Sequence, residues 1–181
     1  MDRPLALALK NRPKDHLNPI LATPETQEAA VLVLLHDDMG IPSLILTKRS
    51  EEVLHHKGQI CFPGGVFDGD ESLWETALRE TEEEIGLKKN QITYLGELGK
   101  IITPTGFQIT PFVGRVLGPI EYVPSAGEIA EIFSVPVSHF LDLKNLEFVP
   151  RDAVFHFRDH KIWGATGRII IEFLEAWKLI R

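Results

Sequence analysis

Residues 65–87 read GVFDGDESLWETALRETEEEIGL, and this stretch decides the fold. Leu73, Ala77 and Leu78 recur at helical spacing, which predicts a helix with one face packed against a core. We expect the helix to open within residues 71–74, where acidic side chains favour the positive end of its dipole. It should end at Gly86, because glycine readily adopts the positive φ of a helix C-cap.

The polar face of this helix carries three carboxylates. Glu80, Glu83 and Glu84 stand at positions i, i+3 and i+4, so they project from one face and repel each other. A solvated acidic surface is one interpretation of such a run. The other is a site for Mg²⁺ or Mn²⁺, hard ions that take oxygen ligands. Arg79 lies four residues before Glu83, where it would fix that carboxylate in one rotamer.

The spacing of glycine, arginine and glutamate residues in this stretch resembles the box motif of the Nudix family. The matching residues are Gly65, Glu71, Arg79, Glu80, Glu83, Glu84, Gly86 and the apolar Leu87. One position departs, because Thr81 stands where the family usually has an aliphatic residue facing the sheet. The resemblance implies an α/β protein with the Nudix fold, an α/β/α sandwich around a central mixed sheet.

The rest of the chain supplies strands on both sides of the box helix, as that sandwich requires. Apolar runs predict strands at 28–36 and 43–47, joined as a hairpin, and others at 58–62, 92–102 and 109–116. A short helix is expected over 135–141, a hairpin strand within 148–159 and a final helix over 165–179. We expect a lead-in over residues 1–27 and a single domain over 28–181.

Composition narrows the class of protein. The net charge of −7 gives no broad basic surface, so we expect no nucleic-acid partner and a small-molecule substrate instead. The single cysteine, Cys61, excludes an intrachain disulfide and a cysteine-rich zinc site. No long apolar span and no leader pattern appears, which predicts a cytoplasmic protein without membrane attachment. Homodimers are common in the Nudix superfamily, so the resemblance makes a second copy of this chain a candidate partner. No stretch of the sequence itself indicates an interface.

A cluster of basic residues precedes the box. Lys48 and Arg49 are followed by His55, His56 and Lys57, which form either ordinary surface charge or a site for substrate phosphates. Adjacent residues point apart on a strand, which argues against zinc held by the two histidines. The glycines after Phe62 allow a tight turn, and the carbonyl of Gly65 would lie near a bound metal.

A narrower resemblance connects this region to the coenzyme A pyrophosphatase branch of the family. It rests on residues 46–50, on Gly58 and Gln59, and on residues 62–65, and it continues at 106–111, 128–137 and 163–166. For such a substrate we expect contacts with Lys48, Arg49, His56, Gln59 and Phe107. Leu54 departs, because the branch commonly has arginine there. Phe62, Phe107 and Trp163 would line the substrate path, or else belong to the core.

The roles of the box residues follow from the family resemblance. It implies that Glu80, Glu83 and Glu84 hold one or more Mg²⁺ or Mn²⁺ ions, that Glu71 supports the loop or an outer metal, and that Arg79 orients its neighbours. The general base differs among members; it would be a box glutamate such as Glu83 or Glu80, or a later-loop residue, here Glu128 with Glu131 as a weaker candidate.

Three functions remain open from the sequence. The first is hydrolysis of coenzyme A or acyl-coenzyme A to (acyl-)4′-phosphopantetheine and adenosine 3′,5′-bisphosphate. The second is hydrolysis of a nucleoside diphosphate sugar or ADP-ribose, an alternative that the departure at Leu54 sustains. The third is a nucleotide sensor without turnover, which the complete set of box glutamates argues against.

Overall fold

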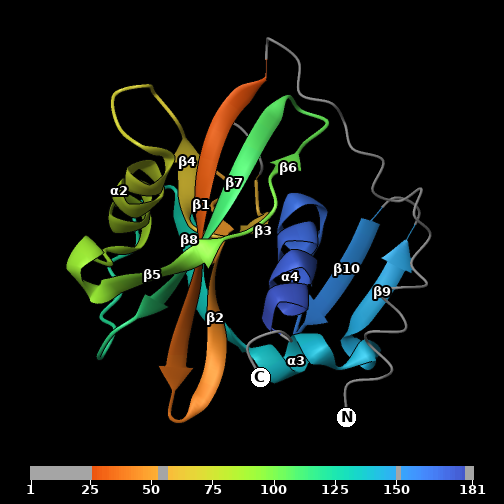
Figure 1. Cartoon of the computed structure of the whole chain (residues 1–181). Coiled ribbons are helices and arrows are strands. Elements are labelled where there is room, and N and C mark those ends of the chain that lie inside the picture. The colour runs from red at the N-terminus through yellow and green to blue at the C-terminus, as the bar shows by residue number, and fades with distance from the viewer. Residues whose placement is uncertain (1–25, 53–56, 150–151, 178–181) are drawn as a thin grey trace.

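A mixed β-sheet forms the centre of the computed structural model, which describes residues 26–52, 57–149 and 152–177 (Figure 1). Its main path runs β3-β2-β1-β7-β5. These strands are Gln27–Asp38 (β1), Ile41–Arg49 (β2), Ile60–Cys61 (β3), Ile92–Glu97 (β5) and Phe107–Val116 (β7). Three more strands join the path: Gly64–Val66 (β4) pairs with β1, Ile101–Ile102 (β6) with β7, and Ile129–Pro136 (β8) with β2.

Strand β1 is buried on both faces, which explains its nearly continuous apolar sequence. Ala30, Leu32 and Leu34 pack with the helix Leu73–Ile85 (α2) on one face. Val33 lies in the cluster on the opposite face, with the helix Gly164–Trp177 (α4). Strand β1 runs parallel to β7 and antiparallel to β2 and β4, so the sheet is mixed. The predicted α/β/α sandwich around a mixed sheet is confirmed.

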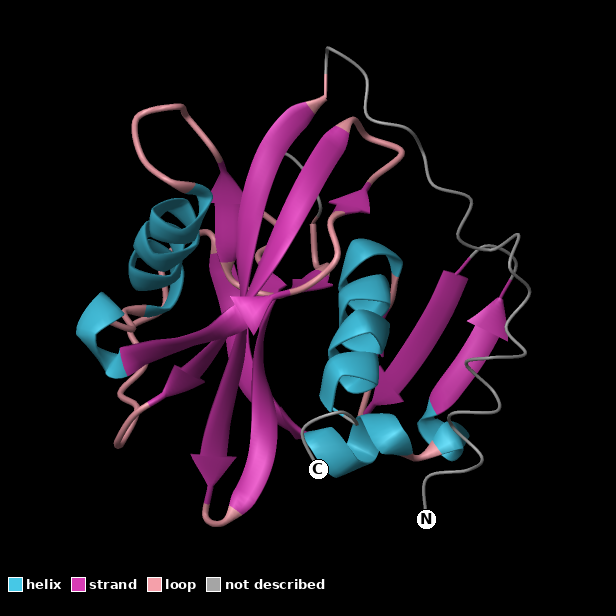
Figure 2. Ribbon diagram, in the orientation of Figure 1, coloured by secondary structure: helices cyan, strands magenta, loops and turns pink. Residues whose placement is uncertain are grey.

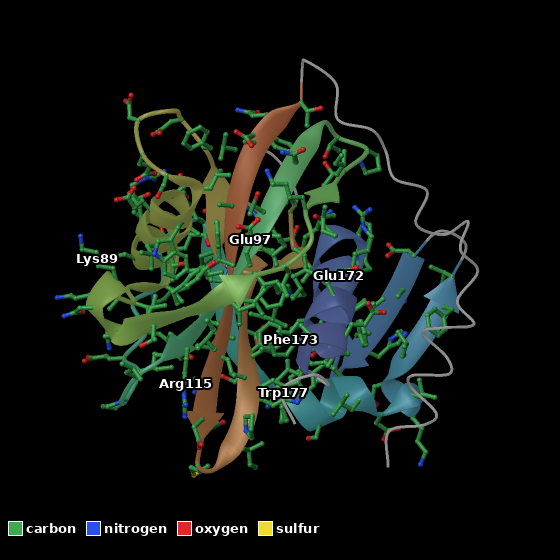
Figure 3. All side chains as sticks on the ribbon, viewed as in Figure 1. Lys89, Glu97, Arg115, Glu172, Phe173 and Trp177 are labelled. Carbon is green, nitrogen blue, oxygen red and sulfur yellow. The ribbon has the colours of Figure 1, made fainter. Side chains whose placement is uncertain are left out.

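A small second sheet lies beyond α4, on the side away from the central sheet (Figure 2). It consists of Leu146–Val149 (β9), Asp152–Phe157 (β10) and His160–Ile162 (β11). A Cβ on Gly167 would lie 2.6 Å from the Ala153 carbonyl oxygen, so helix and strand approach closely only because this residue is glycine. On the other side of α4, Phe173 and Trp177 point toward the central sheet (Figure 3) and stack with ring centroids 5.6 Å apart.

Short helical segments complete the described chain. They are Lys89–Gln91 (η2), Val137–Leu141 (α3) and Leu143–Asn145 (η3). None of the helices in the described ranges is long and apolar enough to cross a bilayer.

Several predicted boundaries are wrong. The segment 92–102 forms two strands, β5 and β6, because the pairing with β7 ends at Glu97 and resumes only at Ile101. Gly99 lies in the gap, and glycines weaken a strand at such points. The segment 58–62 forms only the two-residue β3. The helix predicted over 135–141 begins at Val137, because β8 continues to Pro136 along β2. The hairpin strand expected within 148–159 is confirmed, because Asp152–Phe157 forms β10 and pairs antiparallel with β9 and β11.

Candidate active site

The capped ends and the buried face of helix α2 fix the positions of its carboxylates. Ser72 is the N-cap, and it forms a capping box with Glu75: each side chain accepts from the backbone N–H of the other residue, at 3.2 and 2.9 Å. Gly86 ends the helix with φ of 76°, as predicted. Thr81 is fully buried against the sheet, and its hydroxyl donates to the Ala77 carbonyl at 2.7 Å, which explains how the site tolerates a polar residue.

The three glutamates of the polar face have different surroundings. The side chain of Glu84 is 5% exposed, that of Glu80 22% and that of Glu83 59%. Glu84 accepts a hydrogen bond from the Gly64 N–H at 3.2 Å and one from the Arg49 guanidinium at 3.3 Å. Residue spacing alone does not predict these differences in exposure, because they depend on which part of the helix lies under β4.

Burial raises the pKa of Glu84 to about 7, although the Gly64 N–H and the Arg49 charge act in the opposite direction. The negative charges of Glu80 and Glu128 raise this pKa further. Glu84, Glu80 and Glu128 therefore share one region of negative potential, although Glu128 is far from the helix in sequence. A cation bound there would offset the desolvation cost of the ionised Glu84 carboxylate.

Gly65 makes room for a carboxylate. A Cβ on Gly65 would lie 2.3 Å from Cδ of Glu80, so the absence of a side chain lets Glu80 lie against the backbone of β4. Arg79 fixes the same carboxylate, with Nη1 2.7 Å from Oε1 of Glu80. It also donates to Glu71 at 2.9 Å and to Glu83 at 3.2 Å. The predicted Arg79–Glu83 contact is confirmed, and these contacts raise the pKa of Arg79 above its usual value.

The donor set fits a hard divalent cation. It offers carboxylate oxygens beside the backbone of β4, and the chain places a buried carboxylate, Glu84, where a positive charge would be favoured. Within residues 26–52, 57–149 and 152–177, however, no three His, Cys, Asp or Glu side chains already form a set able to hold an ion. Glu80 and Glu83 are instead in contact with Arg79. Their assignment as metal ligands, with Glu84 and Gly65, stays a prediction.

A cavity of about 1080 Å³ opens beside Gly64 and Gly65. It lies between the sheet and the first turn of α4, and most of its lining is apolar. Among the predicted substrate residues, the cavity is lined by Arg49, Gln59 and Phe107. Lys48 does not line it, because neighbouring residues of a strand point to opposite faces and Arg49 takes the inner position. His56, with His55 and Leu54, lies outside the described residues.

The two candidates for a later-loop base lie at the start of β8. The Glu128 carbonyl accepts from the Ser50 N–H at 2.7 Å, and its exposed carboxylate influences Glu84. Glu131 instead contacts the buried His160 at 3.3 Å. The contacts therefore favour Glu128 over Glu131, as the sequence did, and its role as a base stays a prediction.

Sequence reasoning missed several residues of the cavity, among them a group with polar side chains. This group consists of Thr103, Thr105, Asp152 and Arg168. Three separate segments contribute them, the turn after β6, the start of β10 and the first turns of α4. No local motif joins such distant positions; the one available signal was a basic residue near the start of a helix that otherwise carries an apolar face.

Comparisons with known proteins identify the family. The NUDIX domain model matches residues 26–159. Nudix hydrolase NudL of Photorhabdus laumondii is 37% identical over 138 residues, covering 71% of this chain and 74% of that protein. The namesake from Pectobacterium atrosepticum is 35% identical over 157 residues, covering 81% and 80%.

Solved structures share the fold. A Nudix hydrolase from Mycobacterium smegmatis, RenU, has a TM-score of 0.62 at 20% identity, over 86% of this chain and 88% of that chain. The NUDIX domain of Shewanella oneidensis NrtR, solved with ADP ribose, has a TM-score of 0.56 at 17% identity, over 95% and 97%. With the box helix, its carboxylates and the mixed sheet in place, the chain belongs to the Nudix hydrolase family.

Proposed function

We propose that this protein is a metal-dependent pyrophosphohydrolase that cleaves coenzyme A or acyl-coenzyme A. The observation that carries the proposal is the position of Glu84 and Glu80. Their carboxylates meet Gly64 and Gly65, the first residues of β4, beside a large, mostly apolar cavity. A pyrophosphate held there would extend one of its two substituents into the cavity.

Glu84, Glu80 and Glu83 would hold Mg²⁺ or Mn²⁺ in this proposal, together with the Gly65 carbonyl. A bound divalent ion supplies charge neutralisation on the pyrophosphate and a more acidic water. Arg79 acts as a positioning residue, because it contacts Glu71, Glu80 and Glu83 and not the cavity.

The chain itself would supply the proton acceptor and the phosphate contacts. Glu128 lies near Glu84 and is exposed to solvent, so it is the proposed general base for the attacking water. Arg49 lines the cavity and is held by Glu84, which places its charge beside the proposed pyrophosphate site. Water adds across the P–O–P bridge, and the products are 4′-phosphopantetheine, or its acyl form, and adenosine 3′,5′-bisphosphate.

The shape and lining of the cavity support a substrate of this kind. Drug-sized ligands occupy pockets of about 300–1,000 Å³ lined by apolar and aromatic side chains. The cavity here, about 1080 Å³, is slightly larger than that range and is flanked by Phe62, Phe107 and Trp163. Such a space suits the nucleoside half of coenzyme A.

A nucleoside diphosphate sugar or ADP-ribose is the second candidate. It is favoured by the similarity in fold to the NrtR domain, whose structure was solved with ADP ribose. That likeness concerns the fold alone, whereas the narrower resemblance at residues 46–50, 58–59 and 62–65 supports coenzyme A.

A turnover panel separates these candidates. The purified protein is incubated with coenzyme A, acetyl-coenzyme A, ADP-ribose and ADP-glucose in Mg²⁺ or Mn²⁺, and products are identified by mass. We expect the fastest cleavage with coenzyme A or its thioester. Preference for the sugar nucleotides would replace the proposed substrate, and no turnover of any member would favour a nucleotide sensor.

A further inference from the structure

The far end of the cavity carries a cation that the proposed chemistry does not use. Arg168, on the second turn of α4, lines the cavity together with Thr103 and Thr105. Its Nη2 donates to the Ile102 carbonyl at 3.0 Å, which joins α4 to the end of β6 directly before Thr103. Figure 1 shows this end of α4 beside β6.

The guanidinium is half-buried and lacks a carboxylate in contact. Within the described ranges, no Asp or Glu oxygen lies within 4.0 Å of Arg168. The charge of Asp152 stabilises the Arg168 cation without contact. The two oxygens of Asp152 accept from the N–H groups of Ala153 and Gly164, each at 2.8 Å. A desolvated cation without a paired anion is costly, and a bound anion offsets that cost.

Two aromatic side chains also line the cavity that Arg168 lines. Trp163 and Phe107 both line the cavity, and Trp163 is 49% exposed. A nucleotide base stacks favourably on such rings. A cation, two hydroxyls and two aromatic rings together fit a nucleoside that carries a phosphate away from the reacting pyrophosphate.

Resting on the proposed function, we propose that Arg168 is a specificity-determining residue that binds a phosphomonoester on the nucleoside half of the substrate, the 3′-phosphate of coenzyme A. The nucleoside half then fills the cavity, and its 5′-pyrophosphate reaches Gly64 and Gly65. The pantetheine half points out of the cavity. ADP-ribose lacks this phosphate and leaves Arg168 unpaired.

The test compares two products that differ only in that phosphate. Calorimetric titration gives the affinity of the full chain for adenosine 3′,5′-bisphosphate and for AMP in Mg²⁺. We expect the bisphosphate to bind the wild type about 10-fold or more tightly than AMP, as one charge-assisted contact allows. In Arg168→Gln this ratio should fall to within about 3-fold.

Arg115→Gln is the matched control, because it removes the same charge at the other end of β7, remote from the cavity (Figure 3). It should keep the wild-type ratio. Arg168→Lys retains a cation without the planar guanidinium and should give an intermediate ratio.

Two outcomes overturn the proposal: equal affinities in the wild type, or a ratio that persists in Arg168→Gln. A fall in affinity for both ligands would show that loss of the bond to Ile102 disturbs the loop in that variant. In that case the ratio in Arg168→Lys replaces the second outcome, and a value near one overturns the proposal. The binding ratio needs no turnover, so failure of the turnover panel and failure of this assignment are seen separately.

Discussion

At the scale of single residues, the account depends on the buried carboxylate of Glu84. Its pKa is raised to about 7 by burial, whereas an unfolded chain has the ordinary value of 4.5. The folded protein therefore binds the proton more tightly, and the metal-free fold loses stability as the pH rises from about 4.5 to above 7. Above both values this single group lowers the free energy of unfolding by roughly 3 kcal/mol.

We expect Glu84→Gln to flatten this dependence. In EDTA, the melting temperature of the wild type should fall by several degrees more between pH 5.5 and pH 8 than that of the variant. Thermal unfolding followed by circular dichroism checks the difference. Parallel curves for the two proteins would contradict the raised pKa.

Gly65 gives a second prediction at this scale. Gly65→Ala places a methyl group 2.3 Å from Cδ of Glu80, so the carboxylate must move, while its flexible side chain lets the fold survive. We expect turnover to fall by about 10-fold or more, in line with a misplaced catalytic group, with little change in melting temperature. Gly96→Ala is the control, because nothing lies within 4 Å of its added Cβ. Equal activity of the two variants would show that Glu80 needs no defined position.

Cys61 is the only thiol in the chain, so its reactivity can be used as a probe of the same site. Burial and the negative charge of Glu84 raise its pKa to about 11, so little thiolate forms near neutral pH. Labelling by a disulfide reagent at pH 7.5 should be slow in the folded protein and complete in guanidinium chloride. Glu84→Gln should speed the labelling of the native state, and an unchanged rate would argue against the proximity of the two groups.

At the scale of elements, helix α2 depends on its caps. Ser72 and Glu75 satisfy each other's backbone N–H groups. We expect Ser72→Ala to lower the free energy of unfolding by about 1 kcal/mol. Glu75→Ala should cost a similar amount, and the double variant less than the sum, because both changes break one capping box. Denaturant titrations measure all three, and full additivity would mean that the box contributes nothing as a unit.

The sequence predicted this helix better than any other element. Its apolar spacing, acidic start and terminal glycine all act locally, and all three are present in the structure. Strands β1 and β2 were also predicted, since long apolar runs bounded by polar residues carry the signal within themselves. The extent of β8 was not, because its residues alternate weakly and form a strand by pairing with β2.

In the site, too, the sequence predicted features that depend on neighbouring residues and missed those that depend on distant segments. The box named the glutamates, but the difference in burial between Glu84 and Glu83 arises from the position of β4 over the helix. The sequence also grouped Lys48 with Arg49, although only Arg49 lines the cavity. The end of the cavity at Arg168 required three distant segments to meet, which no spacing in the sequence indicates.

At the scale of the whole molecule, the layers depend on close contact between α4 and the small sheet. Alanine is favoured over glycine in a helix by about 1 kcal/mol, so Gly167→Ala would stabilise a helix without neighbours. Here the added Cβ meets the Ala153 carbonyl at 2.6 Å. We expect a loss of about 1–3 kcal/mol on unfolding in denaturant. A gain in stability would show that β10 and α4 are packed less tightly than described.

The central claim is that Glu84 and its neighbours bind the divalent ion that drives hydrolysis. The most direct measurement is the initial rate of coenzyme A cleavage against Mg²⁺ concentration for the wild type, Glu84→Gln and Glu97→Gln. Glu97 is an exposed carboxylate on β5 outside the site (Figure 3). We expect the rate to vanish in EDTA. Glu84→Gln should cleave at least about 100-fold more slowly, because it loses a transition-state contact. Glu97→Gln should give the same curve as the wild type. Equal curves for the wild type and Glu84→Gln would contradict the central claim.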